Sequence, residues 1–399
     1  MYCSTGKIEQ DYEATGVLYD AGSVYEGLSK LTDDRKARGK LYRLETVLMI
    51  IVMAKLCGAD TPSAITDWGK NHAPQIAEWL QLKRPTMPNC STYWRIMAHK
   101  VYYDEIERLV AVYNQNGKHG VVYALDGKAL RGVRKKDEEG VPYLLSVCDV
   151  EYVKALSQVA VGRKENEISK APQALKSTEI SQKVVTGDAL HTQKALSSQI
   201  LAQGGDYVFP LKENQERLLK NIQQLFAPDC PKPGFGKIQT DFRTTQKVNK
   251  GHGRIETRIL TTSEMLDPYS TWPGLAQVYR LERQFQWWRN GRCYRNSCQI
   301  EYGITSLTRQ EASPARLLEI RRAHWGIEMG LHYRRDVTLH EDATRMTFGN
   351  TGKVMASVNN LVLALIHLAK FHNAAQARRW FAAHPAHAFA LLTTPFSRP

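Results

Sequence analysis

Two short apolar runs that each end in an aspartate place the strongest constraint on this fold. "GVVYALDG" carries Asp126 at its end, and "KVVTGDAL" carries Asp188. Both runs favour β-strands, and a polar stretch follows each of them. Open α/β sheets build their sites at the carboxyl ends of their strands. The two acids are therefore expected at one edge of one sheet.

The surrounding patterns predict a mixed sheet covered by helices, so the fold class is α/β. "PYLLSVCDVEY", "KALSQVAVGRK" and "DYVFPLKENQ" are predicted as strands, and the short link between the first two favours a hairpin. Helical patterns separate the later strands. After a further helix, three long runs before residue 310 indicate a β-rich insertion.

Four segments follow from these changes of pattern. Residues 1–115 are expected to form a helical N-terminal domain, and 116–215 the first part of an α/β core. Residues 216–310 form the β-rich insertion, and 311–399 form the last part of the core with the C-terminal helices.

The N-terminal segment holds one very apolar helix and one candidate DNA-reading helix. "VLMIIVMAKLCG" (47–58) is shorter than the roughly 20 apolar residues that span a bilayer, so a buried helix is expected. Residues 89–100 are the candidate for reading DNA, and an amphipathic helix packed on its neighbours is an equal alternative. Scattered cysteines without C-x-x-C and the lack of a signal peptide favour a cytoplasmic protein without a membrane partner.

The formal net charge of +14 favours a polyanionic partner. Nucleic acid is the commonest such partner. Solubility charge on an unrelated enzyme is the alternative.

A third acid lies in a helix predicted over 316–335. At 100° per residue, Glu328 stands at the centre of a polar arc. The arc also holds Arg321, His324, Trp325, His332 and Arg335. The helix is expected to pack its apolar side on the sheet and to aim a carboxylate flanked by cations at a ligand. A Glu–Arg pair on an exposed stripe is the alternative.

Three converging carboxylates repel each other unless they share a cation. Oxygen ligands favour Mg²⁺ or Mn²⁺, and two such ions would stabilise the attacking and the leaving oxygen of a displacement at phosphorus. The hypothesis is that Asp126, Asp188 and Glu328 are catalytic and bind two Mg²⁺ or Mn²⁺ ions. A helix cap is the alternative role for Asp188.

Side chains around these acids are candidates for contacts with DNA. They are Lys128, Arg131, Lys212, Arg254, Arg258, Arg321, His324, Trp325, His332 and Arg335. Further candidates are Arg134, Lys135, Lys136, Lys164 and His252, although turn chemistry is the simpler account of Lys164. For the turn at 249–258 a solvated hairpin is as plausible, and Trp325 could equally be a core residue.

Two other patterns lie near Glu328 in the sequence. The acids of "DVTLHEDATR" fit a salt-bridged loop better than a second layer around metals. Histidines four residues either side of Glu328 match zinc spacings poorly.

Seven motifs occur in an order that resembles a known family. They are "YALDGKALRG", "KENEI", "VTGDALHTQ", "DYVFPLKENQ", "HGRIETR", "YGITSL" and "HWGIEMGLHYRRDVTLHEDATR". Together they resemble the DDE transposases of ISAs-type insertion sequences, which include the H-repeat proteins associated with Rhs elements. The resemblance covers nearly the whole chain. Single pieces such as "DGK" are weak, whereas the ordered set is specific.

This resemblance implies an RNase H-like core with a β-rich insertion, and a catalytic triad of Asp126, Asp188 and Glu328. The gap from Asp188 to Glu328 is 328 − 188 = 140 residues, which leaves room for the insertion. The implied partners are double-stranded DNA, as terminal inverted repeats and target, and a second copy of the chain in a homodimer. The implied location is the bacterial cytoplasm, on the nucleoid.

The chain departs from one pattern of related transposases. Many carry tyrosine, arginine, glutamate and lysine around the last acid, whereas this chain has Arg321, His324, Glu328 and Arg335. Details of DNA contact, including a hairpin at excision, therefore do not carry over from the wider superfamily.

The expected function is metal-dependent cleavage at element ends and transfer of 3′-hydroxyl strands into target DNA. One rival is a relative that binds DNA without cutting it. The other is a nuclease on the same core that hydrolyses DNA but does not join strands.

Overall fold

The computed structural model describes residues 22–133, 142–162, 165–227, 241–251, 253–266 and 270–395. The chain divides into two compact units. The helical unit comprises Met1–His119, Gly127–Glu165 and Ile327–Pro399. The sheet unit comprises Gly120–Asp126 and Asn166–Gly326.

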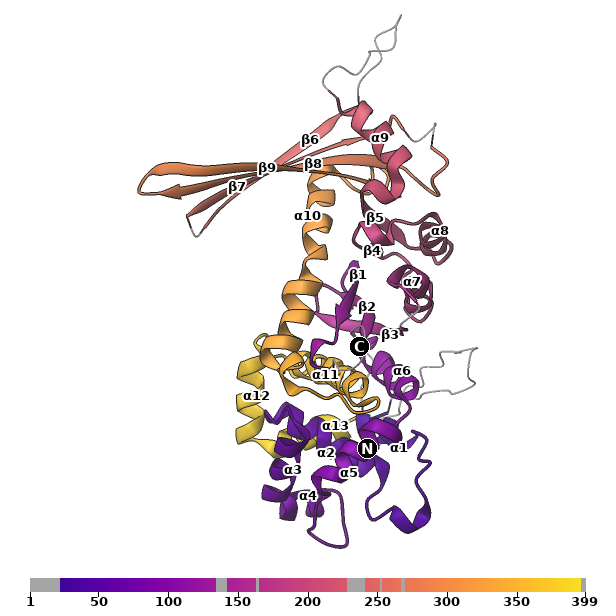
Figure 1. Ribbon diagram of the computed structural model, residues 1–399, viewed down its shortest axis with the longest axis vertical. Coiled ribbons are helices and arrows are strands. Elements are labelled where there is room, and N and C mark those ends of the chain that lie inside the picture. The colour runs from indigo at the N-terminus through magenta and orange to yellow at the C-terminus, as the bar shows by residue number, and fades with distance from the viewer. Residues whose placement is uncertain are drawn as a thin grey trace, which may run out of the picture. The chain divides into compact units, whose positions relative to one another are not determined.

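The helical unit consists of helices with one strand pair (Figure 1). The helices are α1 (Val24–Ser29), α2 (Leu44–Leu56), α3 (Pro62–Asn71), α4 (Ala73–Trp79), α5 (Cys90–His99), α6 (Tyr103–Asn114), α11 (Thr351–Leu368), α12 (Ala374–Ala383) and α13 (Pro385–Thr393). The strands β2 (Tyr143–Asp149) and β3 (Lys154–Val161) form the predicted antiparallel hairpin. The helical character of the N-terminal segment is confirmed.

The core of the helical unit lies around α2 and α11. Almost every side chain of α2 is buried, which confirms the buried helix predicted over 47–58. Among the described residues, α11 is long and apolar enough to cross a membrane, but 83% of it is buried inside the protein, as in a core helix. It packs on α2, α5, α6 and β3.

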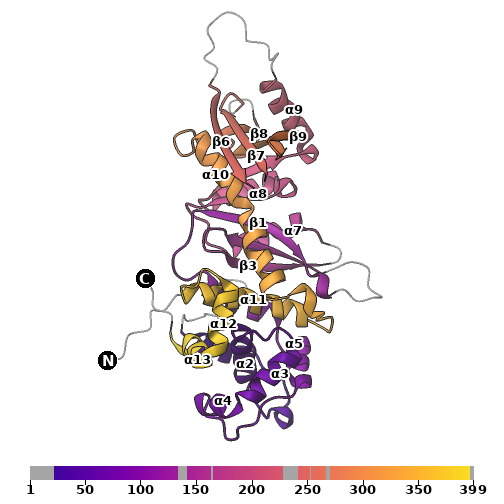
Figure 2. The same ribbon diagram turned by 90° about the vertical axis from the view of Figure 1, so that its left-hand side faces the viewer.

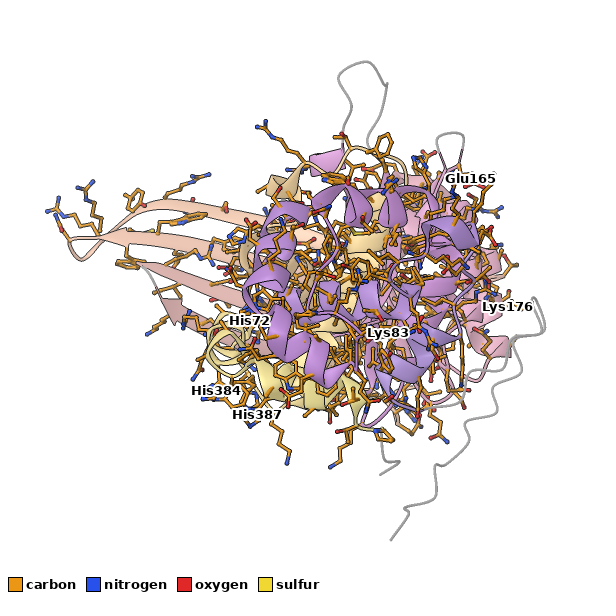
Figure 3. All side chains as sticks on the ribbon, turned by 90° about the horizontal axis from the view of Figure 1, so that it is seen from below. His72, Lys83, Glu165, Lys176, His384 and His387 are labelled. Atoms are coloured by element: carbon orange, nitrogen blue, oxygen red, sulfur yellow. The ribbon has the colours of Figure 1, made fainter. Side chains whose placement is uncertain are left out.

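The C-terminal helices α12 and α13 pack against α2 (Figure 2). Aromatic rings are in contact where α12 ends and α13 begins. Trp380 stacks on His384 with ring centroids 4.6 Å apart, and its ring lies 4.9 Å from that of His387. His384 and His387 are neighbours at this corner (Figure 3).

A buried carboxyl group lies in the core between α6, β3 and α11. Ser357 donates a hydrogen bond to Glu107, and Gln158 Nε2 donates to Glu107 Oε2 at 3.3 Å. Burial raises the pKa of Glu107 to about 7, although the hydrogen bond from Ser357 and the charge of Arg335 act to lower it. Glu107 therefore takes up a proton on folding near neutral pH.

We expect Glu107→Gln to flatten part of the pH dependence of stability. Because the folded pKa is raised, this carboxyl contributes stability that is complete below about pH 4.5 and lost as the pH rises through about 7. A shift of this size corresponds to roughly 3 kcal/mol. The measurement is the free energy of unfolding in urea at pH 5 and pH 8. An equal fall between these pH values in variant and wild type would contradict the assignment.

The sheet unit is a large mixed sheet covered by helices (Figure 1). Its strands, in the order in which they pair, are β1 (Val122–Ala129), β4 (Val184–Thr186), β5 (Asp206–Leu211), β9 (Arg292–Thr305), β8 (Gln277–Arg289), β7 (Arg254–Ser263) and β6 (Arg243–Gly251). Its helices are α7 (Glu167–Lys176), α8 (Lys194–Ala202), α9 (Glu216–Leu225) and α10 (Pro314–His324). β1 continues past Asp126 into the helical unit.

The strands β1, β4 and β5 are parallel, and the strands from β9 to β6 are antiparallel. Because β9 also pairs with β5, the predicted insertion extends the sheet. The mixed α/β class is confirmed, and the RNase H-like assignment stays a prediction. β6 was not predicted, because its polar sequence "RTTQKVNKG" lies largely exposed and lacks apolar alternation.

The single regular helix predicted over 316–335 is wrong. α10 ends at His324, and π-helical turns follow at Ile327–His332 and Arg334–Thr338. A π-turn bonds residue i to i+5, so the 100° spacing does not hold beyond α10. α10 belongs to the sheet unit and packs on β6 and β7, whereas both π-turns belong to the helical unit.

Candidate active site

Asp126 and Asp188 occupy equivalent places on adjacent parallel strands. The register pairs Val122 with Val184 and Ala124 with Thr186, an offset of 184 − 122 = 62 residues. The aspartates are 188 − 126 = 62 residues apart, so each lies two residues beyond the pair Ala124–Thr186. Neighbouring strands are about 4.8 Å apart, and alternate residues share a face. Extended by two residues, this register aligns the two acids on one face. Asp126 lies within β1, which continues to Ala129 and so does not end at the acid as predicted, and Asp188 lies two residues past the end of β4.

Asp188 is held by a histidine that sequence reasoning missed. Its Oδ1 lies 2.7 Å from Nδ1 of His191 and accepts a hydrogen bond from the backbone N–H of His191 at 3.3 Å. His191 is fully buried, and its Nε2 lies 3.7 Å from Oε2 of Glu167 on α7. Asp188 does cap the short turn Ala189–His191, so the cap alternative describes one part of its role. The spacing of Asp and His three residues apart after a strand was the available signal.

The environment keeps Asp188 ionised. Burial acts to raise the pKa of Asp188, but the hydrogen bond and charge of His191 outweigh it, so the pKa is lowered. The pKa of Glu167 is raised instead, by burial first, against the charge of His191. His191 therefore orients one anionic oxygen of Asp188 and leaves the side chain half exposed.

The end of α10 lies over the same strand. Nδ1 of His324 is 3.1 Å from Oγ1 of Thr186, two residues before Asp188. Burial, followed by the charge of Arg321, lowers the pKa of His324 to about 3, so the ring is neutral at pH 7. Arg321 is buried and donates to both carboxylate oxygens of Glu301, at 2.9 and 3.2 Å. The charge of Arg321 is therefore paired inside the sheet unit, and the ring of His324 is not a cation.

Glu328 is an exposed side chain on the π-turn Ile327–His332 in the helical unit. His332 lies on the same turn and is half-buried. Burial and the charges of Arg335 and Lys128 lower the pKa of His332 to about 3, so it too is neutral. The polar arc predicted around Glu328 does not persist, since its members lie on different kinds of helix.

Lys128 does not lie on a DNA-facing surface as predicted. Its side chain is only 6% exposed, and its Nζ lies 2.7 Å from Asp336, 3.6 Å from Glu341 and 3.8 Å from Asp342. The N–H of Arg131 donates to Asp342 Oδ1 at 3.1 Å. The charge of Lys128 is therefore used to hold the segment after Asp126 against the segment at 336–342. The salt-bridged loop predicted for "DVTLHED" is confirmed.

Arg335 is fully buried, so its predicted contact with DNA is wrong. Its Nε and Nη2 donate to the two oxygens of Glu341 at 2.8 Å, and its Nη1 donates to Gln158 at 2.9 Å. Glu341 is also buried and accepts from Asn359 at 2.9 Å. The guanidinium thus neutralises an internal acid.

Some of the remaining predicted DNA contacts lie on or near the surface, whereas Arg321 and His324 are buried. Arg131, Lys212 and Arg254 are exposed, and Trp325 is 45% exposed with the Arg283 guanidinium 4.6 Å over its ring. Arg258 is half-buried and lies 2.6 Å from Glu256. Arg134, Lys135, Lys136, Lys164 and His252 lie outside the described residues.

The two strand-end aspartates fit part of a site for a hard cation. Mg²⁺ and Mn²⁺ prefer carboxylate oxygens, and Asp188 remains anionic on one face with Asp126. Across the described ranges, no three His, Cys, Asp or Glu side chains are grouped closely enough to hold an ion. A third carboxylate or solvent would have to complete the set.

Two known protein families match most of this chain. A family model described as "Transposase DDE domain" matches residues 117–365, and one described as "DDE_Tnp_1-associated" matches residues 25–111. The chain belongs to the DDE transposase family. The first match includes the three acids at the centre of the site hypothesis.

Relatives of this DDE transposase occur in Escherichia coli. YbfL of strain K12 is 26% identical over 352 residues, 86% of this chain and 89% of YbfL. YncI of O157:H7, named as a transposase, is 27% identical over 356 residues, 86% of this chain and 87% of YncI. The H repeat-associated protein YhhI of strain K12, also named as a transposase, is 25% identical over 352 residues, 86% of this chain and 89% of YhhI. The resemblance to H-repeat transposases is confirmed.

A solved structure of the piggyBac transposase synaptic complex with hairpin DNA is similar to this chain with a TM-score of 0.43 and 11% identity. The alignment covers 92% of this chain and 77% of that one.

Proposed function

We propose that this DDE transposase cleaves phosphodiester bonds at the ends of its element and transfers the 3′-hydroxyl strands to target DNA. The observation that supports the proposal is the parallel pairing of β1 with β4, whose register, extended by two residues, aligns Asp126 with Asp188. Glu328 is the proposed third acid, and the core is proposed to be RNase H-like. Family membership supports the reaction class.

The three acids would hold one or two Mg²⁺ or Mn²⁺ ions. When bound, such ions make the attacking hydroxyl more acidic and stabilise charge on the leaving oxygen. The chain's own contribution is positional. His191 fixes the orientation of the Asp188 carboxylate, and the neutral ring of His324 supports the strand beneath it through Thr186.

The proposed DNA contacts are the cations that stay accessible. Lys212 follows the end of β5, which is parallel to β4, and so lies at the same edge of the sheet as Asp188. Arg131, Arg254 and Arg258 would contact phosphates as well, and Trp325 would stack on a distorted base. A second copy of the chain is the proposed partner protein.

The test is a cleavage and joining assay on DNA that carries the element's terminal repeats, with Mg²⁺ or Mn²⁺. Nicks at the repeat ends and joining of pre-cut ends to a target plasmid are expected. Binding without nicking would favour a DNA-binding relative that no longer cuts. Nicking without joined products would favour a nuclease.

Affinity for DNA is expected to fall steeply with salt. Each phosphate neutralised by a cation releases counterions, so log K falls with log salt by about 0.9 per contact. With several contacts, raising NaCl from 50 to 200 mM should weaken binding by at least about 10²-fold. Fluorescence anisotropy over a salt series measures this. An affinity that does not change with salt would contradict a backbone-binding surface.

A further inference from the structure

The two faces of the sheet differ in charge at the outer ends of β6, β7, β8 and β9. Directly paired residues of an antiparallel sheet point to one face, and the next pair points to the other. Residues paired across the four strands form rows, and three alternate rows point to one face. The first row is Lys247, Arg258, Arg283 and Gln299. The second is Asn249, Glu256, Phe285 and Ser297, and the third is Gly251, Arg254, Trp287 and Arg295. We call this the arginine face, and it holds five cations and one acid.

The two rows between them point to the other face and are almost uncharged. They contain Val248, Thr257, Gln284 and Cys298, and then Lys250, Ile255, Gln286 and Asn296. Side chains tipped with nitrogen are visible along the far ends of these strands (Figure 3). Positive charge is thus concentrated on one face by the alternation of the strands.

Aromatic rings hold the arginines of this face in place. The guanidinium of Arg295 lies 4.7 Å from the ring centre of Trp287, and those of Arg254 and Arg283 lie 5.5 and 5.3 Å from that of Phe285. Stacking on a ring fixes an arginine, so the side chain loses less entropy when it binds an anion. The carboxylate of Glu256 lies 3.8 Å from Arg254 and 3.7 Å from Arg283, which leaves the face with a net positive charge. The face is therefore pre-organised for oxyanions.

A hollow of about 150 Å³ adjoins the arginine face at the end of α10. It is lined by Arg258, Arg283, Arg321, Arg322 and Trp325, with Glu301 and Leu281. Arg321 is 7% exposed, and its Nη1 has no hydrogen-bond partner among the described residues. A buried guanidinium N–H without a partner is costly. An anion that enters the hollow would relieve that cost.

We infer that the arginine face binds the phosphate backbone of double-stranded DNA and that the hollow beside Trp325 receives one of its phosphates. The inference rests on the proposed function and adds β8 and β9 to the DNA-binding surface. Arg258 and Arg254 are four residues apart on β7, so the face extends about 14 Å along the strands. Duplex DNA carries a charge per about 1.7 Å of axis and presents several phosphates over that length.

A second copy of the chain is a poorer occupant of the arginine face. In an isologous dimer the same patch would meet itself, so five cations would face five cations. That arrangement is repulsive. A polyanion complements the charge instead.

The test replaces Arg283 and Arg295 by glutamine, singly and together, with Lys250→Gln on the opposite face as the matched control. Binding to a fluorescein-labelled duplex of arbitrary sequence is measured by anisotropy over a salt series. For the double variant we expect a Kd at least about tenfold higher and a log K–log salt slope smaller by about 2, because two phosphate contacts are lost. The control should change Kd by no more than about twofold.

Arg283→Gln could disturb the fold, because Arg283 also lies 3.7 Å from the buried Glu256. Arg295→Gln keeps the test valid in that case, because Arg295 is exposed and its ring contact is with the half-buried Trp287. Wild-type Kd and slope in both the single Arg295 variant and the folded double variant would overturn the inference. If the double variant keeps the wild-type Kd but has a different sedimentation coefficient, the inference is also overturned, and the arginine face is an interface between copies of the chain. If the double variant binds normally while the wild type cleaves element ends, only this inference fails. A wild type that binds no duplex at low salt overturns both proposals.

Discussion

Glu328→Gln is expected to retain DNA binding and to cleave element ends at least about 10³-fold more slowly than wild type, a rise of about 4 kcal/mol in the barrier. The amide keeps the size of the side chain but removes one anionic oxygen donor. Because Glu328 is exposed, the change should leave stability unaltered. Loss of a negative charge near DNA should leave the affinity equal or slightly higher. Single-turnover nicking and anisotropy measure the two effects.

The matched control is Glu319→Gln on α10. Glu319 is also exposed, and its carboxylate forms a surface pair with Arg316 at 3.5 Å. Such pairs contribute little, so wild-type cleavage is expected. Asp126→Asn should resemble Glu328→Gln, since it removes a donor from the neighbouring strand end. A folded Glu328→Gln that cleaves within about tenfold of wild type, a barrier change of only about 1.4 kcal/mol, would refute the proposed triad.

The sequence was most informative where the determining pattern is local. Apolar runs followed by an acid predicted β1 and β4, although β1 continues past Asp126 to Ala129. The parallel register of the two strands, extended by two residues, aligns Asp126 with Asp188. The buried helix α2 followed from continuous apolar sequence. In these cases a few adjacent residues decide both the element and the side of it that is buried.

Charged side chains were predicted less well, because their partners are distant in the chain. Lys128 pairs with Asp336 across 208 residues, and Arg335 bonds Gln158 across 177. The sign of a side chain can be read from the sequence, whereas the acid that neutralises it depends on the tertiary fold. The cations therefore predicted a DNA surface at Lys128 and Arg335, although both side chains are buried and pair with internal acids.

The prediction of one regular helix over 316–335 was wrong for a different reason. Its apolar spacing suits a regular helix, yet the backbone changes to π-turns after Trp325. Side-chain period alone does not distinguish hydrogen bonding to i+4 from bonding to i+5. His191 was missed although its place three residues after Asp188 was visible in the sequence.

Arg335→Met is expected to lower the free energy of unfolding by about 3–5 kcal/mol, because it leaves the buried carboxylate of Glu341 without its main partner. Burial acts to raise the pKa of Glu341, but Arg335 outweighs it and lowers the pKa. The pair therefore contributes stability that is present above about pH 4.5 and is lost as the pH falls. The destabilisation should shrink in acid. Urea unfolding at pH 7 and pH 4 measures it.

A double variant separates the internal role of Arg335 from a DNA contact. Arg335→Met with Glu341→Gln removes both charges, so the summed single effects should exceed the double effect by about 2 kcal/mol. Arg316→Met, which removes an exposed arginine, should cost less than about 1 kcal/mol. Since Arg335 has no exposed surface, folded Arg335→Met protein should bind DNA as wild type does. If Arg335→Met instead binds DNA more weakly while its stability is unchanged, Arg335 contacts DNA and its proposed role in neutralising Glu341 is wrong.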